Sequence, residues 1–428
     1  MKKIDRDHKN NRKKNIIMQI TKNQHYVPRF YMKPFSIIKN EGTKKEKVLI
    51  SFYQFKDNLF RDNVPTTSVC SEDFFYDEDG RIENKLAEKE NKWGSAILKI
   101  NRDEELAASE INDIREFTVY QISRTKAMLD HNQDMATTML TNVLYNQTSD
   151  LDKSVIKEIV EKKVETEITS EYNLDFVKDT LPIIDDLKMC ILENKTDVAF
   201  LTSDVPVIIV NPLGVHRAGL GNIGTVVFFP TSQKKMVMFY DNKLYGKIAE
   251  EIQDSECINA FNKYQYISAD ERILALNSIE FERFTQDKEL NTFREKFHVS
   301  AKTTTSYDGI GTFMAAKSRS IEYYFDIPIL KLPKSLKKIP RDFRETYPRK
   351  YSYETRRAIL CKIYREPDFI KEEKLKNHWR QMQQYAKVLL KYLDYYWNTP
   401  KEDCVISGEF MRQLKEVPVN FFPQENCE

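Results

Sequence analysis

Glycine is scarce in this chain, with 11 among 428 residues. Loops that cradle phosphates need glycines at fixed spacing, and neither a P-loop nor a dinucleotide-binding fingerprint occurs. The six cysteines are scattered and no pair has C-x-x-C spacing, which excludes a zinc ribbon and a disulfide framework. No apolar run reaches membrane-spanning length, and the N-terminus lacks the apolar core of a signal peptide. The sequence therefore predicts no membrane partner and favours a reducing cytoplasm.

Charge is nearly balanced over the whole chain but uneven along it. The sequence holds 67 Lys and Arg against 65 Asp and Glu, a net charge of +2. Residues 1–22 are strongly basic and predict a disordered arm, whereas residues 331–350 are basic with three prolines and predict an extended linker. Both segments would attract nucleic acid irrespective of its sequence.

Hydrophobic periodicity predicts an α+β fold. An apolar fraction of 41% is enough for a sizeable core. Helical patterns occupy residues 81–101, 108–147 (one long helix or two) and 151–172. Strand-like segments occupy 46–56, 186–193, 197–202, 206–211, 224–230, 235–241 and 321–329, and residues 255–270 read as a helix followed by a strand. We expect a helical N-terminal half packed on a mixed or antiparallel central sheet, with a C-terminal helical extension.

That extension contains one clear amphipathic element, residues 371–397. Its apolar residues from Leu375 to Tyr396 follow alternating spacings of four and three, as in a heptad seam. The pattern fits a helix that caps the core, and it equally fits the seam of a homodimer.

Residues 23–35 combine a histidine, an arginine, two prolines and four aromatic rings. Pro28 is suited to open a short helix, which Pro34 would disrupt. His25 would then lie just before the positively polarised end of that helix. We expect a histidine held this rigidly, with Arg29 close by, to have a functional role.

Polar side chains fall on the apolar faces of two predicted helices. Glu83 and Glu90 share the stripe of Leu86, so both carboxylates point toward the interior. On the next helix Gln121 and Arg124 continue the inward stripe. A buried charge needs a partner, and Arg124 is the natural one for either carboxylate. The pattern fits a buried ion-pair network that fixes helix packing, and it also fits a site.

A third polar segment ends an apolar strand. Thr202, Ser203 and Asp204 follow Phe200 and Leu201, and a proline two residues later stops regular pairing. Asp204 fits a metal ligand, a general base or an Asx-type turn former. Asn259 and Asn262 share one face of a predicted helix, as capping residues or as partners of a buried group.

These segments together resemble the uncharacterised, mainly bacterial domain-of-unknown-function family numbered four-two-three-eight. The resemblance is carried by the opening Gln-His-Tyr-x-Pro at residues 24–28, the Glu83–Glu90 helix, Gln121 with Arg124, the 200–207 turn, and Asn259. Val205 departs from the family's usual asparagine. We therefore divide the chain into a basic arm (1–22), a family-like core (23–275), a mixed extension (276–330), a linker (331–350) and a helical region (351–428). The resemblance implies a role in bacterial antiviral defence but no defined reaction.

The leading hypothesis is a metal-dependent hydrolase that acts on phosphodiesters, as a nuclease does. The predicted metal ligands for Mg²⁺ or Mn²⁺ are Glu83, Glu90 and Asp204. The predicted catalytic residues are His25, Glu90, Gln121, Arg124 and Asp204, and the predicted substrate-binding residues are Arg29, Arg124, Thr202, Ser203 and Asn259. The hypothesis requires His25, a carboxylate, Arg124 and Asp204 to converge on one cavity.

Two alternatives use the same residues without catalysis. In the first, the polar cluster binds a nucleotide or a protein signal in a defence system. In the second, the chain is a structural or interaction protein whose buried polar residues lock the fold.

Overall fold

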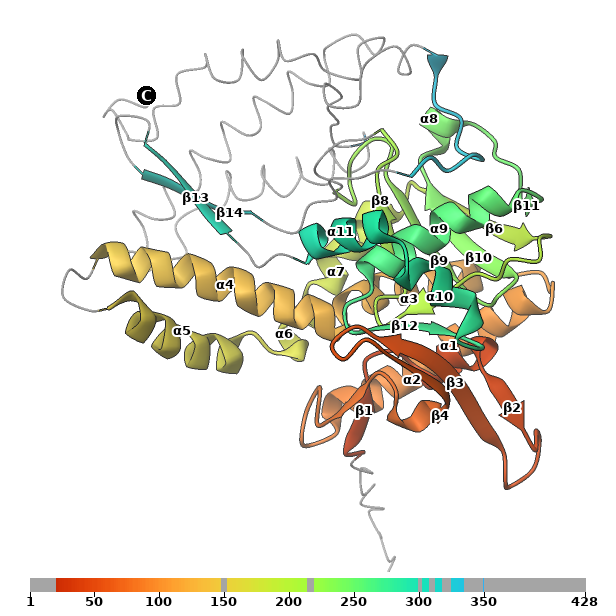
Figure 1. Cartoon of the computed structure of the whole chain (residues 1–428), viewed down its shortest axis with the longest axis horizontal. Helices are drawn as coiled ribbons and strands as arrows, with labels where there is room; N and C mark the ends of the chain where they lie inside the picture. Colours follow the sequence, from red (N-terminus) through yellow and green to blue (C-terminus); the bar gives the residue numbers. More distant parts are fainter. Residues whose placement is uncertain are drawn as a thin grey trace, which may run out of the picture.

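The computed structural model describes residues 21–147, 152–213, 219–298, 302–307, 312–317, 325–334 and 349. Within these residues the fold is α+β, as predicted, with helices packed around antiparallel and mixed sheets (Figure 1). The basic residues 1–20 and the predicted helix 371–397 lie outside the described residues.

The N-terminal segment builds one sheet with the help of strands from much later in the chain. A short antiparallel ladder joins β1 (Asn23–His25) to β5 (Ser71–Asp73). The larger sheet has the order β2-β3-β12-β7, with β4 on the other edge of β3. Its strands are antiparallel and comprise β2 (Ile37–Lys39), β3 (Lys47–Gln54), β4 (Leu59–Pro65), β7 (Thr202–Ser203) and β12 (Arg272–Ala275). Residues about 200 positions apart in sequence therefore share one sheet.

The second sheet is formed by the middle of the chain and is mixed. Its order is β11-β6-β10-β9-β8, and only β11 pairs in parallel. Its strands are β6 (Lys188–Asn194), β8 (Ile208–Val210), β9 (Val226–Pro230), β10 (Lys235–Tyr240) and β11 (Glu251–Ile252). Every residue of β9 and β10 is buried, so these strands form the centre of the core.

Helices and short turns surround the sheets. The described elements of this kind are α1 (Arg29–Met32), η1 (Lys33–Phe35), η2 (Thr66–Ser68), α2 (Arg81–Asn101), α3 (Ala108–Ser123), α4 (Lys126–Gln147), α5 (Lys153–Glu167), α6 (Ser170–Asp175), α7 (Val177–Thr180), η3 (Leu181–Ile184), α8 (Asn242–Tyr245), α9 (Ser255–Ser268), α10 (Ile279–Thr285) and α11 (Lys288–Phe297). Helices α4 and α5 lie side by side as a hairpin that extends away from the sheets (Figure 1). A further antiparallel pair, β13 (Lys302–Tyr307) and β14 (Thr312–Lys317), contacts α4.

Aromatic packing joins the first helices to the second sheet. The ring of Phe117 on α3 lies 5.8 Å from Trp93 on α2, 5.7 Å from Tyr31 on α1 and 5.3 Å from Phe229 on β9, between ring centroids. All four side chains are buried. This packing holds α1, and the segment that precedes it, firmly against the core.

Most predicted elements occur where the sequence placed them. The predicted helix 81–101 is α2, and the 108–147 pattern divides into two helices, α3 and α4. The predicted strand 197–202 is wrong for most of its length, since pairing is confined to β7. No strand forms over the described part of 321–329; instead Ile327 and Leu330 pack into the core beside α9.

Candidate functional site

The Gln-His-Tyr-x-Pro segment is anchored at nearly every residue. Gln24 is fully buried; its amide donates to the backbone oxygen of Asp77 at 2.7 Å and accepts from the N–H of Tyr76 at 2.6 Å. Tyr26 and Val27 are buried, and Pro28 lies at the N-cap of α1. The predicted helix after Pro28 is confirmed, though it is only four residues long.

Two inward-facing polar residues, Gln121 on α3 and Arg124 at its C-cap, bond the backbone of this segment. The buried guanidinium of Arg124 donates from Nη2 to the backbone oxygen of His25 at 2.8 Å, from Nε to the Tyr76 hydroxyl at 2.8 Å, and from Nη1 to Glu90 Oε1 at 2.7 Å. Gln121 donates to the backbone oxygen of Tyr26 at 2.9 Å. Backbone oxygens outside regular structure need such donors once they are buried. Arg124 and Gln121 therefore satisfy the backbone of the motif, and their donors are engaged within the protein.

His25 is only partly buried. Its Nε2 lies 3.1 Å from the backbone oxygen of Thr66. Burial lowers the pKa of His25, as do the positive charges of Arg29 and Arg124, and these effects outweigh the contact with Thr66. The imidazole is therefore neutral at pH 7, the form that accepts a proton.

Among the carboxylates near Arg124, Glu83 has a pKa well above that of an exposed glutamate. Burial and then the nearby negative charge of Glu90 raise the pKa of Glu83 to about 7, against the opposing effect of Arg124. Glu90 is paired with Arg124, whereas no protein partner is found for Glu83 among the described residues. Arg124 thus connects the His25 backbone, Tyr76 and Glu90, and Glu83 lies within electrostatic reach of Glu90 and Arg124. These five residues are hereafter the histidine cluster.

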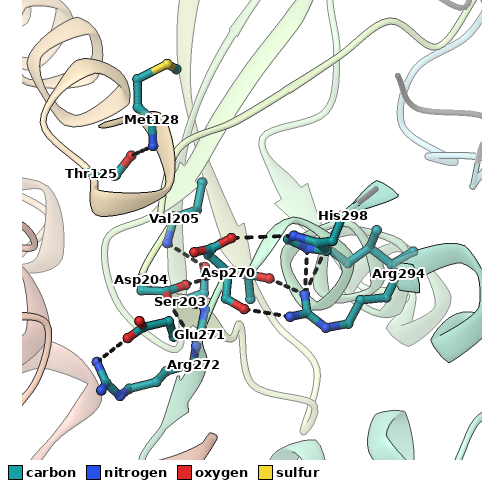
Figure 2. A network of polar contacts seen from close by, with 12 residues as sticks. Thr125, Met128, Ser203, Asp204, Val205, Asp270, Glu271, Arg272, Arg294 and His298 are labelled. Atoms are coloured by element: carbon teal, nitrogen blue, oxygen red, sulfur yellow. Dashed lines mark hydrogen bonds and ion pairs between the residues drawn. The ribbon is translucent and has the colours of Figure 1, made fainter. Parts of the chain in front are cut away.

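Asp204 does not join the histidine cluster. Its carboxylate accepts three backbone N–H bonds, from Asp270 at 2.9 Å, Glu271 at 2.6 Å and Arg272 at 3.0 Å (Figure 2). Burial and then the charge of Asp270 raise the pKa of Asp204 to about 7, although the three N–H donors act in the opposite direction. The carboxylate holds the loop between α9 and β12, and among the described residues no hydrogen bond or ion pair joins it to His25, Glu83, Glu90 or Arg124.

Tyr26 connects the two regions. Its hydroxyl accepts from Arg272 Nη1 at 3.2 Å, next to the Asp204 loop, while the neighbouring His25 ring contacts Thr66. The adjacent residues His25 and Tyr26 therefore contact different parts of the protein. The same loop is held from its other side by α11, where Arg294 donates to the backbone oxygen of Asp270 at 2.6 Å and His298 lies 3.5 Å from the Asp270 carboxylate (Figure 2).

The other predicted substrate-binding residues also lie apart from the cluster. Thr202 Oγ1 is 3.0 Å from the Tyr31 hydroxyl, and Ser203 Oγ accepts from Gln265 at 2.5 Å, both in the interior. Asn259 bonds Arg283 at 2.5 Å on the outer side of α9. Arg29 is exposed, and its charge reaches His25. Of the predicted substrate-binding residues, Arg29 therefore combines exposure with proximity to the cluster.

The predicted metal ligands do not assemble as a set of three. Among the described residues no group of three or more His, Cys, Asp and Glu is arranged to hold a metal ion. Glu83 and Glu90 remain together because they share one face of α2, whereas Asp204 is held by backbone donors elsewhere. Any metal at the histidine cluster would rest on these two glutamates and on groups from its substrate.

Several residues important for this geometry were missed by sequence reasoning. Tyr76 bridges Arg124 and the His25 backbone, and Asp77 accepts from the N–H of Ile82 at the start of α2. Arg272 bonds Tyr26. Asn262, which the sequence pointed to together with Asn259, bonds the backbone of Leu201 and Ala199 and so holds the segment before β7. Only the i, i+3 asparagine pair gave a local signal, because the other partners are distant in sequence.

A family model matches residues 23–278 and is described as Protein of unknown function (DUF4238). The chain belongs to this family. The resemblance drawn from the Gln24–Pro28 motif is thereby confirmed. No curated protein and no solved structure matches this DUF4238 chain. Across the helices that the structure describes, none combines the length and the apolar character that crossing a bilayer requires.

Proposed function

We propose that this chain hydrolyses phosphodiester bonds in nucleic acid at the histidine cluster. The supporting observation is that the surroundings lower the pKa of His25 and raise the pKa of Glu83. His25 is held neutral and can accept a proton, while the raised pKa of Glu83, about 7, keeps much of that carboxyl protonated near neutrality. Pairs of this kind supply the acid and the base of hydrolytic reactions.

In this proposal His25 takes the proton of the attacking hydroxyl or water, and Glu83 donates a proton to the leaving oxygen. The exposed guanidinium of Arg29 binds the phosphate, which Arg124 is not free to do because Glu90, Tyr76 and the His25 backbone engage it. Arg124 and Gln121 act as positioning residues, since they hold the backbone that carries His25. A cytoplasmic role in bacterial antiviral defence belongs to the same proposal.

A divalent metal ion, Mg²⁺ or Mn²⁺, is an alternative form of the proposal, in which Glu83 is ionised and binds the ion instead of donating a proton. Glu83 and Glu90 would hold it, because two neighbouring carboxylates with substrate phosphates are a common ligand set for Mg²⁺. When bound, the ion would supply positive charge for the phosphate. Calorimetric titration of Mn²⁺ into the protein and into Glu83→Gln tests this without an activity assay; no binding by the unmodified protein would rule the metal out.

The test of the proposal is the pH dependence of cleavage of labelled single-stranded RNA and DNA. The rate should peak at mildly acidic pH and fall above about pH 7, where Glu83 loses its proton. His25→Asn should lower the maximal rate by about 100-fold or more. Glu88→Gln, an exposed position on the same helix, is the matched control and should cleave normally. Absence of cleavage of either substrate, with or without added metal, would contradict the proposal.

The second candidate is a non-catalytic binding module for a nucleotide or a protein signal. It is favoured by the engagement of Arg124, Gln121 and Asp204 in the fold itself. Under this alternative, Arg29 and His25 would bind a phosphorylated ligand without turnover. Unchanged substrate recovered from a stable complex would support the binder, and released product would exclude it.

A further inference from the structure

An arginine from beyond the family region is buried within the family region. Arg349 lies past the end of the match at residue 278, yet it is only 4% exposed. Sequence analysis placed it in a basic linker available to nucleic acid. The structure corrects this for Arg349, because its guanidinium is enclosed by protein.

Every nitrogen of this guanidinium is engaged. Nε lies 3.0 Å from both carboxylate oxygens of Asp186, and Nη2 donates to Asp186 Oδ1 at 2.9 Å and to the backbone oxygen of Ile183 at 2.5 Å. Nη1 donates to the backbone oxygens of Leu220 at 2.7 Å and Asn222 at 3.0 Å. The backbone N–H of Arg349 donates to Gly221 at 2.6 Å. Asp186 and the carbonyls of Ile183, Leu220, Gly221 and Asn222 are hereafter the arginine socket.

The chemistry of the arginine socket selects for arginine. One carboxylate and three carbonyls, all acceptors, surround a planar group that has only donors. A lysine ammonium has three donors at one point and cannot reach acceptors on several sides. The additional bond from the backbone N–H of Arg349 to Gly221 lies outside the guanidinium, so a simple guanidinium compound cannot make it.

We infer that the arginine socket is a docking site that fastens the chain beyond the family region to the DUF4238 domain through Arg349. A buried ion pair of this kind is weak as a source of stability compared with apolar packing, but it specifies one arrangement. Both walls of the socket lie in the family region: Ile183 belongs to η3, Asp186 follows it before β6, and Leu220, Gly221 and Asn222 precede β9. The inference is independent of the proposed hydrolysis.

The experiment uses the full chain and a labelled synthetic peptide spanning residues 344–354. In the unmodified protein Arg349 occupies the socket at high effective concentration, so the peptide should bind weakly. The Arg349→Ala variant leaves the socket open and should bind the peptide at least about tenfold more tightly. Adding Asp186→Asn should abolish that gain, and a peptide with lysine at 349 should bind at least about tenfold more weakly.

Hydrogen exchange supplies a second readout that does not depend on the peptide. Arg349→Ala should speed amide exchange in residues 183–187 and 219–223, whereas Arg344→Ala, the matched control in the same basic segment, should not. Thermal unfolding of each variant establishes that the domain is folded. Equal peptide binding by the unmodified protein and Arg349→Ala, or equal exchange in Arg349→Ala and Arg344→Ala, would overturn the inference.

Discussion

At the residue scale, the central finding concerns what the inward polar side chains do. The sequence placed Gln121 and Arg124 on buried faces, and the structure confirms both positions. The same placement was compatible with a catalytic pocket and with a structural network. Their partners decide between the two, because Arg124 and Gln121 bond backbone oxygens of residues 25 and 26. No local pattern predicts a bond between residues about 100 positions apart, so this distinction required coordinates.

Replacing Arg124 should be far more damaging than replacing its acidic partner. Arg124→Ala removes the donor to Glu90 and to the Tyr76 hydroxyl oxygen and leaves the His25 carbonyl with the Tyr76 hydroxyl as its donor, at a cost of about 3–5 kcal/mol in the free energy of unfolding. Glu90→Gln keeps an amide oxygen for Arg124 and should cost much less. Urea unfolding measures both variants. Equal losses would show that the ion pair, not the anchoring of the backbone, is the important interaction.

Glu83 should make stability depend on pH in a defined direction. Its pKa is about 7 in the folded chain and near 4.5 when unfolded, so the folded state binds the proton more tightly. As pH rises from 4.5 to 7, the unfolded state loses its proton first and the free energy of unfolding falls. Glu83→Gln cannot titrate and should lack this decline, which solvent screening limits to about 1 kcal/mol.

Urea unfolding of the protein and of Glu83→Gln at pH 5.0 and 7.5 tests this expectation, with Glu88→Gln as the control. The decline between the two pH values should be smaller in Glu83→Gln than in either of the others. An identical decline in all three proteins would assign the pH dependence to other groups.

At the element scale, the long helices and most strands of the second sheet were predictable, whereas the two-residue strand β7 was not. Residues 81–101 carry several turns of apolar periodicity, so α2 was found with its bounds. Strand β7 has two residues, and within the part of the chain that the structure describes it pairs with β12 alone, about 70 positions later. Its pairing depends on Asn262 and on the loop that Asp204 holds, which the local sequence does not reveal.

The loop between α9 and β12 should depend on the Asp204 carboxylate for its stability. Asp204→Ala removes the acceptor of three buried N–H groups between α9 and β12, which should lower the free energy of unfolding by about 3 kcal/mol. Asp204→Asn retains one acceptor oxygen and should lose less. Chemical unfolding of both variants provides the measurement. Full stability of Asp204→Ala would mean that the carboxylate has no structural role and would restore it as a site candidate.

At the scale of the whole molecule, the fold class and the family were both accessible from sequence. The Gln24–Pro28 motif identified the family, and the short β-branched and aromatic segments after residue 186 predicted a mixed or antiparallel sheet, which is mixed. The sharing of one sheet by β3 and β12, and the insertion of Arg349 between two loops, were not accessible. Both are long-range contacts without local periodicity. The proposed dimer seam from Leu375 to Tyr396 lies outside the described residues and stays a prediction.

Under the proposed function the two polar centres, the histidine cluster and the Asp204 loop, have different roles. The most direct test is to measure phosphodiester cleavage per folded molecule for Glu83→Gln and Asp204→Asn side by side, under conditions where both variants are folded. We predict that Glu83→Gln loses about 100-fold or more of the rate, whereas Asp204→Asn stays close to the unmodified protein. Loss of cleavage in Asp204→Asn with full cleavage in Glu83→Gln would contradict this assignment of the site.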